Sequence, residues 1–313
     1  MPESLRYSVL VVNWNVRDLL RTCLASVYAE AREPSSQFEV IVVDNASGDG
    51  SAAMVAREFP QVRLIESAEN LGFGRANNLA YGLSRGRAVV LLNPDTVVLD
   101  GALERAVARL ESLPRVGVLG TRLVNADGSL QRWTGGALPG LRNVLRHHLM
   151  LDRVVPRSWR GPSLFLDDDV EEDVAVEWVS GACMVLRREA LAGRLFDERF
   201  FMYGEDLELC ARLRAAGWGV LYSPVATVIH HQGRSMEQQS GAILLTSLKG
   251  PRAFYLLRHG RRTVWLYDLI TATGFLLRWI AYSVLALGRA HYAVRASSSR
   301  RYMTRAVHVL IGR

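Results

Sequence analysis

The feature that most constrains the fold is a short apolar run that ends in a proline-containing turn. Residues 88–92 read Ala-Val-Val-Leu-Leu, and Asn93-Pro94-Asp95-Thr96 follow at once. The run is too short for a helix and rich in branched side chains, so it predicts a buried strand. Pro94 has no N–H to donate to a sheet, so the chain must turn there. A carboxylate at such a turn either holds a divalent cation or caps the following helix.

Strand-like and helix-like segments alternate through the first 120 residues. Residues 7–12, 38–43, 62–65 and 116–119 also read as strands. A helical pattern follows the first of them, with apolar residues at three-and-four spacing: Leu19, Leu20, Cys23, Leu24 and Val27. Strands that alternate with helices at short intervals predict an α/β fold with a doubly wound, mostly parallel sheet.

Polar clusters follow the strands of this predicted sheet and precede its helices. They occupy residues 13–15, 44–47, 70–78 and 93–96, so we expect them to line one edge of the sheet. Glycines there let a backbone approach a ligand, and helix N-termini favour anionic groups. The sequence contains neither a P-loop motif nor Gly-x-Gly-x-x-Gly after the first strand. The edge is therefore better suited to a base, a ribose and a metal-bound diphosphate than to a P-loop cradle.

The second half of the chain is less regular. Residues 135–170 predict an irregular loop, which either faces a second substrate or is a solvated linker. Residues 174–178, 182–186, 218–222 and 226–229 predict four strands.

Two polar pairs occur in this half of the chain. Glu205 and Asp206 fall in the first turn of a predicted helix, where the macrodipole stabilises carboxylates, and a general base needs the same rigid placement. The pair His230-His231 at a strand end is either structural or a ligand.

Composition restricts the class of protein and its compartment. Of the 313 residues, 49% are hydrophobic and 22% charged, which is typical of a folded chain. The three cysteines are far apart, which favours a reducing compartment and argues against a structural zinc site. The first strand begins at residue 7, so we expect no signal peptide and a cytoplasmic location.

The positive charge is concentrated at the C-terminal end. From Lys249 to Arg313 the chain has twelve Lys or Arg residues and one acid, a net +11, whereas the first 248 residues carry 26 basic and 30 acidic groups, a net −4. Such asymmetry indicates an anionic partner, and the absence of zinc-finger and basic-zipper spacing favours lipid over nucleic acid.

Within this basic segment lies an apolar stretch long enough to cross a bilayer. Residues 269–288 are apolar except for Arg278, which at mid-bilayer would cost roughly 2.5–3.5 kcal/mol. Arg278 and Arg289 lie about three helical turns apart, so they share a face. A helix lying in the membrane interface and a helical pair packed on a catalytic domain both remain open.

Eight motifs in this order carry a resemblance to a known family: Asn13-Trp14-Asn15, Asp44-Asn45-Ala46-Ser47, Asn70-Leu71-Gly72-Phe73-Gly74, Asn77-Asn78, Asn93-Pro94-Asp95-Thr96, Trp178-Val179-Ser180-Gly181-Ala182, Phe200-Phe201-Met202-Tyr203-Gly204-Glu205-Asp206 and His230-His231-Gln232-Gly233-Arg234-Ser235. The chain resembles the family 2 glycosyltransferases, most closely the bacterial rhamnosyltransferase-like branch, over residues 6 to about 240. We therefore expect a catalytic domain at 1–240 and a basic helical segment at 241–313.

The resemblance implies a GT-A fold and an inverting transfer from a nucleoside-diphosphate sugar, with dTDP-rhamnose as the donor that branch similarity suggests. The acceptor would be a hydroxyl of a glycan or of a polyprenyl-linked sugar in cell-surface polysaccharide synthesis. The enzyme would work in the cytoplasm at the inner face of the membrane, with an anionic lipid surface and no nucleic acid as partner.

The resemblance also assigns roles to individual residues. Asp206 would be the catalytic base, with Glu205 beside it. Asp95 and His230, rather than His231, would hold Mg²⁺ or Mn²⁺, because Asn93 replaces the first acid of the family's Asp-x-Asp motif. Asp44 would read the base, within a donor-binding set of Asn13, Asn15, Asp44, Asn45, Gly72, Asn77, Asn93 and Asp95. The acceptor would meet Trp178, Gly181 and Glu205.

Two other functions stay open on the sequence. A nucleotidyltransferase also places metal-binding carboxylates on an α/β sheet, but it would want a glycine-rich basic loop where Asn13-Trp14-Asn15 stands. A catalytically silent glycan- or lipid-binding protein would have no need to keep both Asp95 and Asp206.

Overall fold

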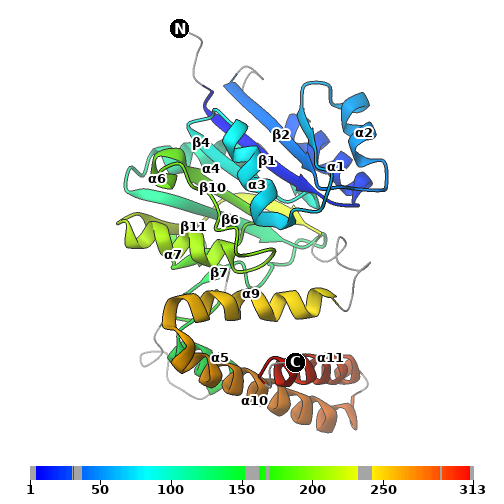
Figure 1. Ribbon diagram of the computed structural model, residues 1–313, viewed down its shortest axis with the longest axis vertical. Coiled ribbons are helices and arrows are strands. Elements are labelled where there is room, and N and C mark those ends of the chain that lie inside the picture. Colours follow the sequence, from blue (N-terminus) through cyan, green and yellow to red (C-terminus); the bar gives the residue numbers. More distant parts are fainter. Residues whose placement is uncertain are drawn as a thin grey trace. The chain divides into compact units, whose positions relative to one another are not determined.

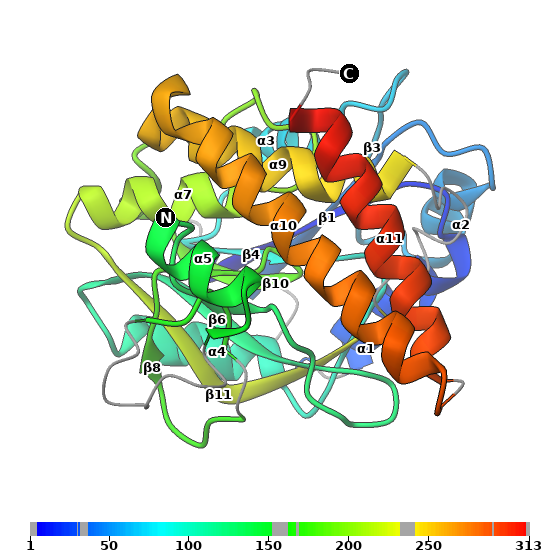
Figure 2. The same cartoon turned by 90° about the horizontal axis from the view of Figure 1, so that it is seen from below.

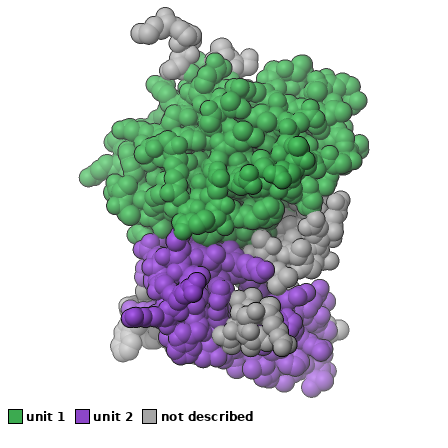
Figure 3. Space-filling view, viewed as in Figure 1, with its two compact units in different colours: residues 1–136, 165–238 green, residues 137–164, 239–313 purple. Residues whose placement is uncertain are grey.

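The computed structural model describes residues 5–29, 31, 37–151, 162–166, 169–231, 242–289 and 291–310. The chain forms two compact units, one from residues 1–136 and 165–238, the other from residues 137–164 and 239–313 (Figure 3). Residues 137–164, expected within the catalytic domain, thus belong to the same unit as the C-terminal helices. The functional division at residue 240 stays a prediction.

The first unit is built on a mixed sheet (Figure 1). Its main strands run in the spatial order β3 Arg63–Glu66, β2 Phe38–Asp44, β1 Tyr7–Asn13, β4 Ala88–Leu92, β10 Cys183–Arg187, β6 Val116–Val124, β11 Gly219–His230 and β5 Thr96–Val98. The strands from β3 to β4 are parallel, and β10 runs antiparallel to both β4 and β6. The predicted α/β architecture is confirmed, with an antiparallel strand inserted at its centre.

Helices cover both faces of the parallel strands. Helices α1 (Arg17–Ala29), α2 (Ser51–Glu58) and α4 (Ala102–Glu111) share one core with Val9, Val42 and Val90. Helix α3 (Gly72–Leu83) packs against β1 and β2. The alternate residues Leu10, Ile41 and Leu91 are also fully buried. Because successive side chains point to opposite faces, burial on both explains the unbroken apolar runs.

Smaller elements complete this unit. The strands β7 (Gly135–Gly136) and β9 (Trp178–Val179) form a separate two-stranded ribbon, and β8 (Val174–Ala175) pairs with β11. The strand predicted at residues 174–178 is therefore split between β8 and β9. Two helices follow β10, namely α6 (Arg188–Leu191) and α7 (Glu205–Ala215).

Two sequence predictions in this region were wrong. The strands predicted at 218–222 and 226–229 are one strand, β11, which pairs with β6 on both sides of a register shift between Ser223 and Thr227. Pro224 lies at this shift, where a residue without an N–H is tolerated. Residues 135–170 are not wholly irregular, because they contain β7 and helix α5 (Leu141–His148).

The second unit consists of α5, α9 (Ala242–His259), α10 (Arg261–Ala286) and α11 (His291–Leu310), with α10 and α11 side by side (Figure 2). Its core contains Val144, Tyr255, Val264 and Tyr267, and the rings of Tyr255 and Tyr267 stack with centroids 4.7 Å apart. Helix propensity alone does not predict α5, because its apolar face is short and is stabilised by packing on α9 and α10.

Arg278 takes part in packing within the second unit. Its Nη2 donates to the carbonyl of His147 at 2.8 Å, and its Nη1 lies 3.3 Å from His148 Nδ1. Burial, with neighbouring His147 and Arg278, lowers the pKa of His148 to about 3, so this ring is neutral. Arg278 therefore packs on α5, and whether the rest of α10 lies in a membrane interface stays a prediction.

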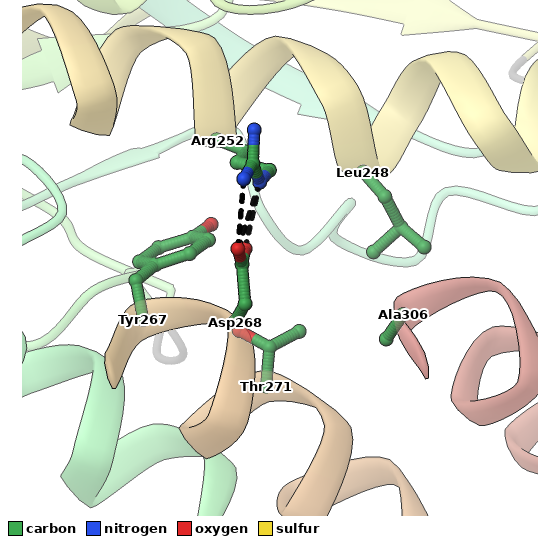
Figure 4. Close-up of a pocket in the computed structure, with 6 residues that line it drawn as sticks. All are labelled: Leu248, Arg252, Tyr267, Asp268, Thr271 and Ala306. Carbon is green, nitrogen blue, oxygen red and sulfur yellow. Dashed lines mark hydrogen bonds and ion pairs between the residues drawn. The ribbon is translucent and has the colours of Figure 1, made fainter. Parts of the chain in front are cut away.

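A small cavity in this unit is lined by Leu248, Arg252, Tyr267, Asp268, Thr271 and Ala306 (Figure 4). Its volume of about 20 Å³ admits one water molecule. Arg252 Nε donates to Asp268 Oδ1 at 2.8 Å, whereas the buried Thr271 Oγ1 has no hydrogen-bond partner among the described residues. The cavity is too small for a sugar or a nucleotide.

Candidate active site

The ends of β1 and β2 place Asn13 beside Asp44, which are paired in register. Asn13 Nδ2 donates to Asp44 Oδ1 at 2.9 Å and to Ser47 Oγ at 3.1 Å, and the Ser47 N–H donates to Asp44 Oδ2 at 3.0 Å. Both residues are buried, and Asn13 Oδ1 has no partner among the described atoms. A carboxylate with a donor on each oxygen is held in one orientation, as recognition of a nucleobase requires.

Asn15 and Asn45 shape the loops around this carboxylate. Asn15 adopts a left-handed backbone (φ 54°), and its Oδ1 accepts the N–H of Gly48 at 2.8 Å. Asn45 Oδ1 accepts the N–H of Leu71 at 2.8 Å, and its Nδ2 donates to Asn70. The structure thus gives both amides a task within the protein, while their contact with a donor stays a prediction.

Helix α3 connects this edge to the acidic pair. Gly72 has φ +77°, and a Cβ there would lie 2.5 Å from the carbonyl oxygen of Phe201, so only glycine fits. The next N–H, of Phe73, donates to the same carbonyl at 2.8 Å. Asn77 is buried and donates to the Phe73 carbonyl at 3.0 Å. Gly72 therefore lies against the segment before Glu205, whereas Asn77 bonds within α3, and contact of either residue with a donor stays a prediction.

The turn after β4 meets the end of β11. Antiparallel pairing of His230 with Thr96 brings His230 to Asp95, with Nε2 3.2 Å from Oδ1, and Asn93 Nδ2 lies 3.3 Å from the same nitrogen. Both Asp95 and His230 are buried. His231 contributes its backbone N–H to the Asp95 carbonyl at 2.8 Å. The two predicted metal ligands are thus adjacent, and coordination stays a prediction.

Gln131, which the sequence did not reveal, sets the orientation of His230. Its Nε2 donates to the His230 carbonyl and, at 3.1 Å, to Asn125 Oδ1, so its Oε1 is left to accept from His230 Nδ1 at 3.0 Å. Nδ1 then carries the proton, and the Nε2 lone pair faces Asp95. A lone pair beside a carboxylate, oriented by an outer amide, suits a divalent cation.

This pair supplies only part of a coordination sphere. Among the residues that the structure describes, no group of three or more His, Cys, Asp or Glu side chains could hold a metal. A cation on Asp95 and His230 would take its other ligands from diphosphate oxygens and water, as is usual for phosphate-bound cations. No motif marks Gln131 in advance, because it lies in plain sequence after the turn at residues 125–128.

Glu205 and Asp206 begin α7 after a left-handed turn at Tyr203 (φ 65°) and Gly204 (φ 95°). Glu205 is 5% exposed and its Oε2 has no partner among the described atoms, whereas Asp206 is partly exposed. Asp206 Oδ1 accepts the N–H of Leu207 at 2.8 Å, and Gly181 donates a further backbone hydrogen bond to this carboxylate.

The two carboxyl groups have different charge states. Burial raises the pKa of both, and the charge of Asp206 raises the pKa of Glu205 further. The backbone N–H groups of Leu207 and Gly181 oppose this rise at Asp206. Asp206 therefore ionises first and is the available base, while Glu205 keeps its proton.

The predicted acceptor residues Trp178 and Gly181 lie in β9 and in the loop after it. Trp178 is buried in β9, and its ring packs edge to face on Phe165 with centroids 6.1 Å apart. Gly181 holds Asp206 through its N–H. Their contact with an acceptor stays a prediction.

Comparison with known proteins decides between the families that this arrangement allows. Residues 8–194 match the family described as "Glycosyl transferase family 2". The chain belongs to this family. The chain is 32% identical to the N-acetylglucosaminyl-diphospho-decaprenol L-rhamnosyltransferase of Mycobacterium tuberculosis. The alignment of 321 residues covers 97% of this chain and 98% of the relative. It is also 30% identical to the O-antigen biosynthesis protein RfbC of Myxococcus xanthus, covering 83% of this chain but 19% of that longer protein.

A solved structure shows the same fold. The mannosyltransferase PcManGT of Pyrobaculum calidifontis, in complex with GDP-Man and Mn²⁺, aligns with a TM-score of 0.60 and 21% identity over 98% of this chain and 88% of that one. The glycosyltransferase fold and family predicted from the sequence are confirmed. Membership in this family leaves no support for the nucleotidyltransferase alternative.

Proposed function

We propose that this glycosyltransferase moves L-rhamnose from dTDP-rhamnose, with inversion, to a polyprenyl-diphosphate-linked N-acetylglucosamine in cell-surface polysaccharide synthesis. The relative that matches over nearly the whole chain supports this substrate class. The observation that carries the mechanism is the Asp206 carboxylate, held by backbone N–H groups beside a carboxyl that keeps its proton.

In the mechanism, Asp44 and Asn13 bind the nucleoside, and Asp206 acts on the acceptor. Asp206 accepts the proton of the acceptor hydroxyl as that oxygen bonds to the anomeric carbon. The bond from this carbon to the diphosphate oxygen breaks, and its electron pair leaves with the diphosphate. A single displacement inverts the stereocentre, so no residue needs to act as a nucleophile, unlike in retaining hydrolases.

We propose Mn²⁺ or Mg²⁺ as the cofactor, held by Asp95 and His230. When bound, the cation neutralises the charge of the diphosphate leaving group. An imidazole nitrogen among the ligands favours Mn²⁺ over Mg²⁺, which prefers oxygen. The orientation of His230 by Gln131 supports this assignment.

We also propose that the second unit binds the inner surface of the cell membrane. Helix α10 is the one described helix long and apolar enough to cross a bilayer by length and composition, which alone is weak evidence. Five of the seven large apolar side chains that α10 exposes recur on one face: Trp265, Leu269, Leu276, Ile280 and Val284. Exposed Arg261 and Arg262 precede them, so the helix suits an anionic interface. Co-sedimentation with anionic vesicles tests this, and equal binding to neutral and anionic vesicles would refute it.

The decisive experiment combines donor, cation and acceptor. Nucleoside-diphosphate sugars are screened for thermal stabilisation with Mn²⁺, and transfer from dTDP-rhamnose to N-acetylglucosaminyl-diphospho-lipid is followed, with the product anomer assigned by NMR. Asp206→Asn should lower transfer by at least about 10³-fold while donor stabilisation survives. Turnover comparable to wild type in this variant, or a retained anomeric configuration, would overturn the mechanism.

A further inference from the structure

Trp133 combines exposure with an unfavourable backbone. Its side chain is 58% exposed, and its φ of 65° lies in the left-handed region. For a residue with a Cβ this conformation costs about 1–2 kcal/mol, and it persists where the surrounding structure fixes it, often at functional sites. The fold thus exposes the Trp133 side chain to solvent and keeps its backbone in a conformation that costs free energy.

The exposed ring is fixed by other aromatic rings. The indole of Trp133 packs on Phe165 with centroids 6.1 Å apart and planes at 57°. Phe165 in turn packs edge to face on the buried Trp178. These three rings, which we call the aromatic ladder, run from the interior of β9 to the surface. A ring held in this way loses little conformational entropy when a ligand packs on it.

The aromatic ladder is anchored to the segment that holds the catalytic base. The carbonyl of Thr134, next to Trp133, accepts the N–H of Ser180 at 2.8 Å. The N–H of the following residue, Gly181, bonds to the carboxylate of Asp206. The nucleotide end, with Asn13 and Asp44, lies instead at the ends of β1 and β2. Trp133 is therefore tied to the acceptor side of the reaction.

We propose that the exposed face of Trp133 is a subsite for a sugar ring of the acceptor. This inference rests on the proposed function, because it assumes that Asp206 deprotonates an acceptor hydroxyl. A pyranose presents an apolar C–H face that an indole covers well, while its hydroxyls stay in water. Trp133 is thus a binding residue that takes no part in the bond changes.

The test uses the full chain with dTDP-rhamnose, Mn²⁺ and two acceptors, N-acetylglucosaminyl diphosphate on a short alkyl chain and on a polyprenyl chain. Trp133→Ala should raise the KM for both acceptors about tenfold, with kcat and the donor KM within about twofold. Trp133→Phe should recover most of the loss. Val225→Ala, which truncates an exposed apolar side chain elsewhere in the first unit, should leave the kinetics with both acceptors unchanged.

Calorimetric titration of the short-chain acceptor in the presence of dTDP and Mn²⁺ gives a second readout, in which Trp133→Ala should weaken binding by the same factor. An unchanged acceptor KM in a Trp133→Ala protein with wild-type thermal stability would overturn the inference. A loss confined to the polyprenyl acceptor would also overturn it, since the ring would then meet the isoprenoid. Absence of transfer by the wild type would instead overturn the proposed function.

Discussion

The two ends of the candidate site differ in how their polar groups are satisfied. At the end proposed to bind the metal, which we call the metal end, Asp95 and Asn93 contact Nε2 of His230, whereas Gln131 contacts Nδ1. At the acid end, one oxygen of Glu205 is buried without a partner among the described residues. The first arrangement suits the proposed cation, whose charge stays fixed through the reaction, and the second suits the proposed proton transfer.

The two ends are also built on different backbone elements. The metal end lies at the junction of β4, β5 and β11, where sheet pairing fixes side chains. The acid end follows the left-handed turn at Tyr203 and Gly204 and begins a helix. Sheet register gives precise side-chain placement, whereas the left-handed turn positions a carboxyl pair of which Glu205 is buried and Asp206 is partly exposed.

The largest effect is expected at the metal end. Asp95→Asn removes the carboxylate beside His230, so Mn²⁺ binding should be lost and transfer should fall by at least about 10³-fold. Excess EDTA should do the same to the wild type. Paramagnetic resonance titration of Mn²⁺ and initial rates measure both, with the exposed Glu171→Gln as a matched control. Full activity of the wild type in EDTA would remove the cation from the reaction.

A smaller loss is expected when only the orientation of His230 is disturbed. Gln131→Leu keeps the volume but removes the acceptor for Nδ1, so Mn²⁺ affinity should fall about 10–100-fold. Gln131→Glu keeps an acceptor oxygen and should retain more affinity than the leucine variant. Equal Mn²⁺ affinity in Gln131→Leu and wild type would show that the ring is oriented by Asn93 and Asp95 alone.

The difference between the two ends also explains what the sequence could predict. Strand ends are visible as apolar runs that stop on polar residues, so the sequence predicts Asp95 and Asp44 as candidate site residues. It does not predict Gln131, because the contact of Gln131 is a hydrogen bond to His230, 99 residues away, which no local pattern records.

Tertiary packing overrode local patterns elsewhere. Helix α5 forms from a stretch that contains Gly and His residues, because Val144 packs on Tyr255 and Tyr267. For Arg278 the sequence left a membrane surface and a protein partner open, because spacing shows which residues share a face but not what covers that face. In the structure Arg278 donates to the carbonyl of His147. The two strands predicted at 218–222 and 226–229 are one strand, because β11 stays paired with β6 on both sides of Pro224.

The third prediction concerns the pH dependence of kcat, which reports on Asp206 at the acid end. Burial, rather than the charge of Glu205, raises the pKa of Asp206 above its ordinary value of 3.8. Its carboxylate is lost as the pH falls through the raised value, so kcat should drop about tenfold per pH unit from well above pH 4. Glu205→Gln, which replaces a protonated acid by a neutral amide, should leave this acid limb in place. A limb that moves below pH 4 in that variant would assign the shift to Glu205.

The smallest effect concerns stability, and it is again confined to the acid end. The fold raises the pKa of Glu205 from 4.5 to about 8. Between these two pH values the folded protein therefore binds more protons than the unfolded chain. Its stabilising contribution is complete below about pH 4.5 and is lost as the pH rises through the folded pKa. One pKa unit corresponds to about 1.4 kcal/mol.

Glu205→Gln abolishes this titration. The variant should therefore melt at a higher temperature than the wild type at pH 8, by about 2–4 °C for each kcal/mol, and the gain should vanish near pH 4.5. Calorimetric scans across this range measure it, and Glu171→Gln, at an exposed position, should show no such trend. A pH-independent gain would mean that Glu205 has the same proton affinity folded and unfolded, and the contrast between the two ends would then rest on hydrogen bonding alone.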